Sequence, residues 1–161
     1  MTQKLENLAR DTRLRVAINT GNRALVQRDG DDLNGISPAL ARRLADEIGA
    51  QMVPVTYDGA GKVFNDAGHA NWDVGFLAID EKRAEKIAFT QPYITIEATF
   101  AVRASSEMAD VGDVDRDGVR VLTSTGSAYD MHLTKSLQHA TLERSGTPPE
   151  SFAEFLEGRC D

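Results

Sequence analysis

The chain has 161 residues, 41% of them hydrophobic and 27% charged, which suffices for one sizeable core or two small lobes and does not indicate disorder. Its 25 acidic and 18 basic residues give a net charge of −7, so binding to nucleic acid or to anionic membranes is not expected. The single cysteine, Cys160, cannot form a disulfide within the chain, and no apolar run approaches the ~20 residues that span a bilayer.

Strand and helix patterns alternate from the start of the chain to about residue 80. In chain order, the expected elements are strands at 14–19, 51–57 and 73–79, with helices at 35–50 and 59–68 between them. The third strand (DVGFLAI) alternates too little between polar and apolar residues to be half exposed. We therefore expect it to be central in the sheet and covered on both faces.

The helix expected at 35–50 (GISPALARRLADEIGA) has the clearest pattern. Ser37 is placed to cap its N-terminus, and Pro38 suits the first helical position. A single apolar stripe facing the core is predicted by residues that recur at every fourth position: Ile36, Leu40, Leu44 and Ile48.

The pattern changes after Tyr93. Residues 94–102 (ITIEATFAV) are rich in β-branched residues and are expected to be extended, and the polar stretch 103–118 marks a boundary. The elements expected beyond it are strands at 119–124 and 141–146 and helices at 126–140 and 147–158. The repeated order of strand and helix predicts an α/β fold with mainly parallel sheets in two units, residues 1–102 and 103–161.

Some motifs resemble metal or cofactor sites but lack essential parts. Residues 113–124 begin like an EF-hand loop, yet Ser124 stands where such a loop needs a bidentate glutamate, so calcium is not expected. His132 and His139 would lie ~10 Å apart on one helix, too far to share a metal. No phosphate-binding loop, dinucleotide fingerprint or nucleophile elbow occurs, so no cofactor or metal is predicted.

The first candidate anion site lies around Arg83, shortly after the third expected strand. Open α/β sheets bind ligands at the carboxyl ends of their strands, and a guanidinium there can fork onto a carboxylate while the amides of Leu77 and Ala78 add donors. A surface arginine paired with Glu81 or Glu85 is an equally weighted alternative.

The second candidate anion site is the stretch STGSAYD. Gly126 permits a tight turn and Ser127 can cap the following helix, whose first amides then point outward toward an anion. An ordinary capped helix is the favoured alternative from spacing alone.

A resemblance to a known family emerges from the order of these pieces: LRVAIN, GISPALARRLADEIG, WDVGFLAIDEKRAEKIAFTQPY and VRVLTSTGSAYD. Over residues 13–161 the chain resembles the periplasmic solute-binding proteins of amino-acid ABC transporters, family 3, with the type II two-lobe fold. The most specific part is Trp72–Asp73–Val74, then Arg83, then the stretch FTQPY at 89–93.

The resemblance implies roles for particular residues. Arg83 would clamp the α-carboxylate of an amino acid from the first lobe, and the amides of Ser127 and Ala128 would contribute from the second. Backbone groups that hold the carboxylate and amine are implied at Phe76, Leu77 and Ala78. From their places near strand ends or the crossover, further lining candidates, each with a favoured structural alternative, are Asn22, Tyr57 and Glu97.

Departures from the family pattern concern Ala78, which replaces a carboxylate-binding threonine of many members, and the stretch DEKR, which keeps only the arginine of the usual TPER. The chain also stops at Asp161, before the rest of the second lobe and the acidic residue that usually takes the ligand's ammonium. We therefore expect a truncated member whose incomplete second lobe either self-associates or binds weakly in an open state.

The leading interpretation is a binding protein that holds a small amino acid or related carboxylate in a cleft between lobes and performs no chemistry. The alternatives are a dehydratase-type enzyme of the cyclohexadienyl or arogenate kind, with Glu97 as general acid, and a ligand-sensing domain. The resemblance implies an ABC-transporter permease as partner and a periplasmic location. Because the chain as given begins without a signal-peptide pattern, a cytoplasmic location is also compatible.

Overall fold

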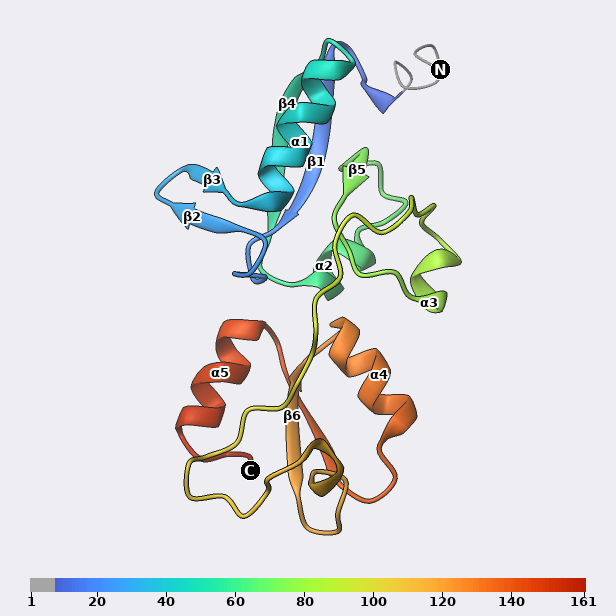
Figure 1. The fold of residues 1–161 in the computed structure, drawn as a ribbon. Coiled ribbons are helices and arrows are strands. Elements are labelled where there is room, and N and C mark those ends of the chain that lie inside the picture. The colour runs from blue at the N-terminus through green and yellow to red at the C-terminus, as the bar shows by residue number, and fades with distance from the viewer. Residues whose placement is uncertain (1–7) are drawn as a thin grey trace. The chain divides into compact units, whose positions relative to one another are not determined.

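The computed structural model describes residues 8–161, and the chain divides into two compact units, one extending to Ala88 and the other running from Phe89 to Asp161. In Figure 1 the first unit runs from blue to green and the second from yellow to red. Each unit has its own sheet and its own apolar cluster, so each is described by itself.

Parallel strands form the main sheet of the first unit, in the order β4 (Gln51–Tyr57), β1 (Arg13–Asn19) and β5 (Val74–Gly75). The prediction of strands at 14–19 and 51–57 is confirmed. The prediction of a central third strand is wrong, because β5 contains two residues at the sheet edge and β1 is central. The apolar residues after Gly75 leave the sheet and form a loop, which places them next to the candidate site.

The core of the first unit is built on β1. Leu14, Val16 and Ile18 are 0% exposed, because β1 has a strand on each side and packs against α1 (Ile36–Glu47). Complete burial of such side chains is favourable by about 1.5–3 kcal/mol each. This strand therefore fixes the frame from which the site residues project.

The helix α1 differs in two ways from its predicted form. Its N-cap is Gly35, with φ 103°, so Ser37 lies inside the helix and makes no capping bond. The predicted apolar stripe is only half buried: Ile36 and Leu40 are each 40% exposed, whereas the small residues Ala41 and Ala45 are buried against the sheet. The helix rotates so that its small side chains allow close approach to the strands.

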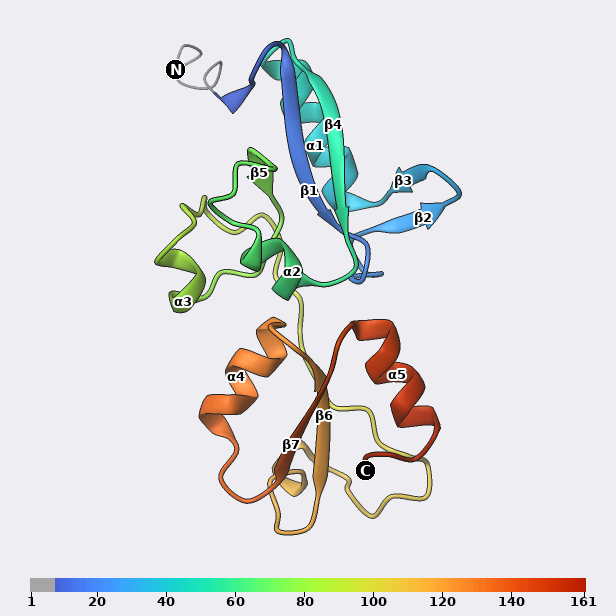
Figure 2. The same cartoon turned by 180° about the vertical axis from the view of Figure 1, so that it is seen from behind.

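The remaining elements of the first unit are short. An antiparallel hairpin, visible from behind in Figure 2, joins β2 (Gln27–Asp29) to β3 (Asp32–Asn34) and projects away from the main sheet. The helix α2 spans Ala60–Asn65, and α3 spans Glu81–Ala84.

An ion pair ties β5 to β1. The Asp73 carboxylate, 5% exposed, accepts hydrogen bonds from the Arg15 amide (3.0 Å) and from the Arg15 side chain at Nε (3.0 Å) and Nη2 (2.6 Å). Arg10 approaches the same carboxylate at 3.3 Å. These bonds, first among them that from the Arg15 side chain, hold the pKa of Asp73 below its usual range. Asp73 of the family-like WDV stretch is thus a structural anchor.

The second unit holds a two-stranded parallel sheet, β6 (Arg120–Ser124) and β7 (Thr141–Ser145), flanked by α4 (Ala128–Ser136) and α5 (Pro148–Leu156). Its apolar cluster is small, with Val114, Val121 and Leu133 as the buried members. Residues 94–102 form no strand, and most of their side chains are exposed.

The calcium-like stretch is explained by local structure. The Asp115 carboxylate accepts hydrogen bonds from the amides of three successive residues, Gln138, His139 and Ala140, at 2.8–3.1 Å. These bonds lower the pKa of Asp115, and they stop α4 short of the predicted residue 140. Within residues 8–161, no group of three or more His, Cys, Asp or Glu side chains is arranged to hold a metal.

The described helices were also compared with the length and apolarity that a membrane span requires. None of those in residues 8–161 meets both conditions.

Candidate functional site

A small pocket opens where β1 and β5 end side by side at the same edge of the sheet. Its lining comes from the end of β1, the following loop, the start of α1 and the residue after β5: Asn19, Asn22, Leu25, Val26, Ser37 and Phe76. Its volume is about 10 Å³, enough for one water-sized group. Parallel α/β sheets bind ligands at this edge, which makes the pocket a candidate site for part of a ligand.

Some donors and acceptors of the pocket make no hydrogen bond to the described part of the protein. Asn19 Oδ1 accepts a hydrogen bond from the Gly21 amide at 3.1 Å, which leaves the NH₂ group of Asn19 as a donor. The Asn22 side chain and the Ser37 hydroxyl have no hydrogen-bond partner among residues 8–161. Ser37 is 1% exposed and is one of the residues that line the pocket.

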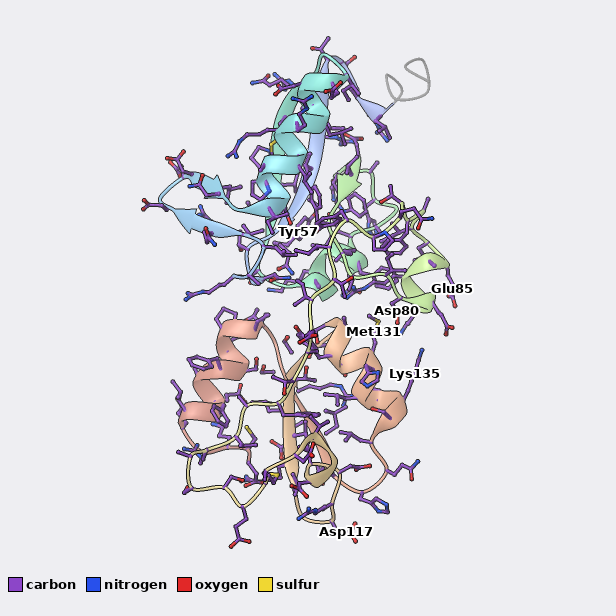
Figure 3. All side chains as sticks on the ribbon, viewed as in Figure 1. Tyr57, Asp80, Glu85, Asp117, Met131 and Lys135 are labelled. Atoms are coloured by element: carbon purple, nitrogen blue, oxygen red, sulfur yellow. The ribbon has the colours of Figure 1, made fainter. Side chains whose placement is uncertain are left out.

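The loop after β5 carries the second group of candidate residues. The amides of Leu77 and Ala78 donate to no acceptor in the part of the chain that the structure describes, so they remain as donors. Asp80 then caps α3 by accepting from the amides of Lys82 (2.9 Å) and Arg83 (3.3 Å), which fixes the start of the turn that carries Arg83. Figure 3 labels Asp80 beside this helix.

Arg83 is the largest fully buried side chain of the described chain, at 0% exposed. Its Nη1 donates to the Ala78 carbonyl oxygen at 3.0 Å, which folds the guanidinium back toward the loop after β5. Burial lowers the pKa of Arg83, while the nearby Asp80 acts in the opposite direction. The pKa of a guanidinium is so high that it stays charged, so a buried arginine favours an anion nearby.

Two other predicted lining residues, Tyr57 and Glu97, are not among the residues that line the small pocket. The Tyr57 hydroxyl donates to the Asp66 carboxylate, and burial followed by this bond raises the pKa of Tyr57 to about 12. Tyr57, at the end of β4 in Figure 3, does not line the small pocket. Glu97 belongs to the second unit, where its side chain is exposed.

The start of α4 holds the candidates of the second unit. Ser127 caps this helix by accepting from the Asp130 amide at 3.0 Å, as predicted, while its own amide donates to Ser124 O at 3.1 Å. The Ala128 amide has no acceptor within residues 8–161. The Asp130 carboxylate accepts from the Gly126 amide at 2.8 Å, so an internal anion already occupies one donor of this helix start.

The structure thus brings Asn22 and Phe76 into one pocket, and it brings Arg83 on α3 against the loop that contains Ala78. Sequence reasoning missed Asn19 and Ser37. A polar residue at the last position of a strand whose apolar residues are buried was the available signal for Asn19. Ser37 was assigned to capping, and no sequence signal distinguishes a capping serine from one turned into a pocket.

The two-unit α/β architecture, with parallel sheets and a polar pocket at the strand ends, is that of a type II periplasmic-binding-protein fold. Residues 14–152 match the family described as bacterial extracellular solute-binding proteins, family 3, and the chain belongs to this family. The sequence resemblance noted above is therefore confirmed.

Solved structures agree on the fold. An ancestral amino acid-binding protein, described as a precursor of cyclohexadienyl dehydratase, matches with a TM-score of 0.84 and 22% identity, over 98% of this chain and 71% of its own. The cysteine-binding protein from Campylobacter jejuni matches with a TM-score of 0.82 and 20% identity, over 99% of this chain and 64% of its own. A lysine-complexed ABC-transporter binding component from Wolinella succinogenes matches with a TM-score of 0.75 and 19% identity, over 94% and 67%.

One curated relative has a name of another kind, that of an enzyme. Membrane-bound lytic murein transglycosylase F of Pseudomonas fluorescens (strain Pf0-1) is 26% identical over 138 residues. The match covers 83% of this chain but only 28% of the relative's length.

Proposed function

We propose that this chain binds a small amino acid or a related carboxylate as the substrate-binding component of an ABC transporter, and that it performs no chemistry. The family is one of solute-binding proteins, and the structural neighbours are mostly amino-acid-binding proteins. The ligand class and the transporter role go beyond what family membership supplies.

The observation that carries the proposal is the buried guanidinium of Arg83 beside a loop with amide donors to spare. A carboxylate is the ligand group that best suits this guanidinium, because its two oxygens match the parallel N–H groups of an arginine. The amides of Leu77 and Ala78 would complete its hydrogen bonding. We assign the ligand's carboxylate to this loop of the first unit.

A contribution from the second unit is proposed at the start of α4. The Ala128 amide is the donor that remains at this helix start, since the Ser127 amide donates to Ser124 and the Ser127 hydroxyl caps the helix. An N-terminal amide of a nine-residue helix favours an anion or a carbonyl oxygen.

Catalysis is not proposed because the candidate general acid lacks the setting that acid–base chemistry needs. Glu97 is exposed and has no hydrogen-bond partner in the described chain. A general acid is normally tuned by burial or by a neighbouring charge.

We further propose two protein partners. The first is an ABC-transporter permease on the extracytoplasmic side of the membrane, which the family membership supports. The second is another copy of the chain, bound through the second unit, where Phe152 and Leu156 lie one helical turn apart on α5 and are each 62% exposed. Light scattering with and without Phe152→Ser tests the second partner, since a monomer at all concentrations would remove it.

Calorimetric titration of the whole chain with single amino acids tests the binding function. We expect saturable binding of at least one amino acid. Mass spectrometry of the solution after the titration should show that the amino acid is unchanged. A new product would establish the enzyme alternative, and no heat with any amino acid or small carboxylate would refute the binding role.

The arginine assignment has its own test. Arg83→Lys keeps the charge but loses the two parallel bonds, so we expect at least a tenfold loss of affinity, within the ~2–5 kcal/mol typical of a broken buried charge pair. Circular dichroism must show the variant folded. Unchanged affinity in a folded Arg83→Lys variant would contradict the assignment.

A further inference from the structure

A groove lined by three arginines lies at the start of β1, at the opposite end of this strand from the candidate ligand site. Its lining residues are Arg10, Asp11, Thr12, Arg13, Arg15 and Gln51, and we call it the arginine groove. Its volume is about 540 Å³, a size typical of pockets that hold small molecules. Because β1 runs for seven residues, the groove lies ~20 Å from the small pocket at the other end of the strand.

A tight turn brings two of the arginines together. Arg10 and Arg13 exchange both of their backbone hydrogen bonds, at 2.8 and 2.9 Å, and so form an antiparallel bridge. The side chains of such a pair project from the same face, and Arg15, two residues further along β1, shares that face. Like charges in directly opposed positions destabilise a strand pair. The groove therefore concentrates positive charge in a chain whose net charge is −7.

The turn itself is held in an unfavourable conformation. Its two central residues, Asp11 and Thr12, have φ values of 49° and 61°. Turns with positive φ at both central positions favour Asn-Gly or Asp-Gly, and a β-branched residue such as Thr12 is rarely found there. Backbone strain of this kind is concentrated at functional sites, because the surrounding structure must maintain it. The strained turn therefore points to a function of the groove independently of its charge.

The acidic groups at the groove neutralise only part of its charge. The Asp73 carboxylate accepts three hydrogen bonds from Arg15 and lies 3.3 Å from Arg10 Nε. In contrast, the Arg13 guanidinium is exposed and makes no ion pair or hydrogen bond within residues 8–161. The Asp11 carboxylate forms no ion pair with any of the three arginines in that part of the chain. One guanidinium thus remains without a counter-charge, beside a second that shares its acidic contact.

We propose that the arginine groove binds a small anion that carries at least two negative charges, as a phosphate or as a pair of carboxylates. The Arg13 guanidinium would form two parallel hydrogen bonds with an oxyanion group, and Arg10 would add a second positive charge from the same face. Gln51, in register with Arg13 on β4, would add an amide donor. A zwitterionic amino acid lacks the charge that this site favours, so the anion is a different ligand from the one assigned to Arg83.

Calorimetric titration of the whole chain with sodium phosphate and with sodium succinate, at constant ionic strength and neutral pH, tests the proposal. We expect saturable binding of at least one of these anions, and the tighter of the two distinguishes a phosphate ligand from a dicarboxylate. Arg13→Gln should weaken this binding about tenfold, the value of one charge-assisted hydrogen bond. Arg28→Gln, which removes an exposed arginine of β2, is the matched control and should leave the affinity unchanged.

Asp11→Asn should give a gain in affinity, which a folding defect cannot imitate. Removal of this negative charge should tighten anion binding about threefold, and asparagine suits the positive φ at this position. Binding of neither anion, or equal affinities of Arg13→Gln and Arg28→Gln, would overturn the proposal. Weaker anion binding by Asp11→Asn would overturn it as well. All of these outcomes are separate from the test of the amino-acid site, because Arg83 does not line the groove.

Discussion

The two units differ in how their strands are paired and in how much apolar surface they bury. In the first, the central strand β1 is paired on both sides, and four of its side chains are 0% exposed. In the second, β6 has β7 as its one strand neighbour, and the apolar side chains of α5 at Phe152 and Leu156 face solvent. The first unit thus has the larger apolar core, and the second has a small core that is supplemented by polar bonding.

The polar bonding of the second unit converges on one carboxylate. Asp130 accepts from the Gly126 amide (2.8 Å) and from Arg144 Nε (2.7 Å), while Thr134 lies at 3.2 Å. Networks of this kind hold a small core in one arrangement, but they tolerate the loss of a partner poorly. The difference between the units predicts that matched changes will have unequal effects.

The largest effect is expected from truncating a core side chain of the first unit. Ile18→Ala should lower its free energy of unfolding by about 4 kcal/mol, because the surrounding strands and α1 cannot close the cavity. Leu133→Ala in the second unit should cost about 2 kcal/mol, since Leu133 lies in a smaller cluster that can relax. Hydrogen exchange resolved by unit measures both, and equal costs would contradict the contrast between the cores.

The next effect concerns the Asp73 anchor. Asp73→Ala leaves the amide, Nε and Nη2 of Arg15 without their acceptor, so we expect a loss of about 3 kcal/mol confined to the first unit. Asp58→Ala, which breaks a pair exposed on both sides, is the control and should cost below about 0.5 kcal/mol. Equal costs measured by urea unfolding would show that the anchor adds nothing beyond a surface pair.

A smaller effect, with a pH signature, is expected at Asp130. Burial raises the pKa of this carboxyl, but the bonds from Gly126 and Arg144 outweigh it and the net shift is downward. A lowered folded-state pKa gives stability that is present above the unfolded value of about 4 and lost as the pH falls through the folded value. Asp130→Asn should therefore cost about 1–2 kcal/mol at pH 7 and progressively less below pH 4. A cost that does not change with pH would exclude the charge as its cause.

The smallest effect is expected at a helix cap of the second unit. Ser127→Ala removes the acceptor for the Asp130 amide and should lower the unfolding free energy by about 1 kcal/mol. Ser127→Asn retains a cap and should restore most of this loss. If both variants melt like the parent protein, the cap does not contribute.

The sequence pattern predicted most of the helices and strands, but it did not predict which neighbours they pack against. The strands β1 and β4 follow from apolar runs between turn residues, and the helix at 147–158 follows from the Thr147 cap. The place of β5 at the sheet edge could not be predicted, because an apolar run does not tell whether its side chains meet a second strand or a ligand loop. The same limit applied to α1, where a regular stripe gave no sign that Ala41 and Ala45 would be the buried face.

The candidate site divides in the same way. Arg83 and the amides at Leu77 and Ala78 were identified from their position after a strand. In the structure they lie in the segment that follows β5. Asn19 and Ser37 were missed because their role depends on two elements that are distant in the sequence and adjacent in space. Contacts between segments that are distant in the sequence can be identified only once the fold is known.

Trp72, the single tryptophan of the sequence, has a practical consequence. Its indole Nε1 is buried without a hydrogen-bond partner in the described chain, and its ring packs on Gly75, where an added Cβ would meet Cζ3 at 3.6 Å. Gly75 directly precedes the residues assigned to ligand binding. The protein therefore carries its one tryptophan fluorophore in an apolar setting beside its candidate site. Its emission wavelength would report rearrangement of that loop without any added label.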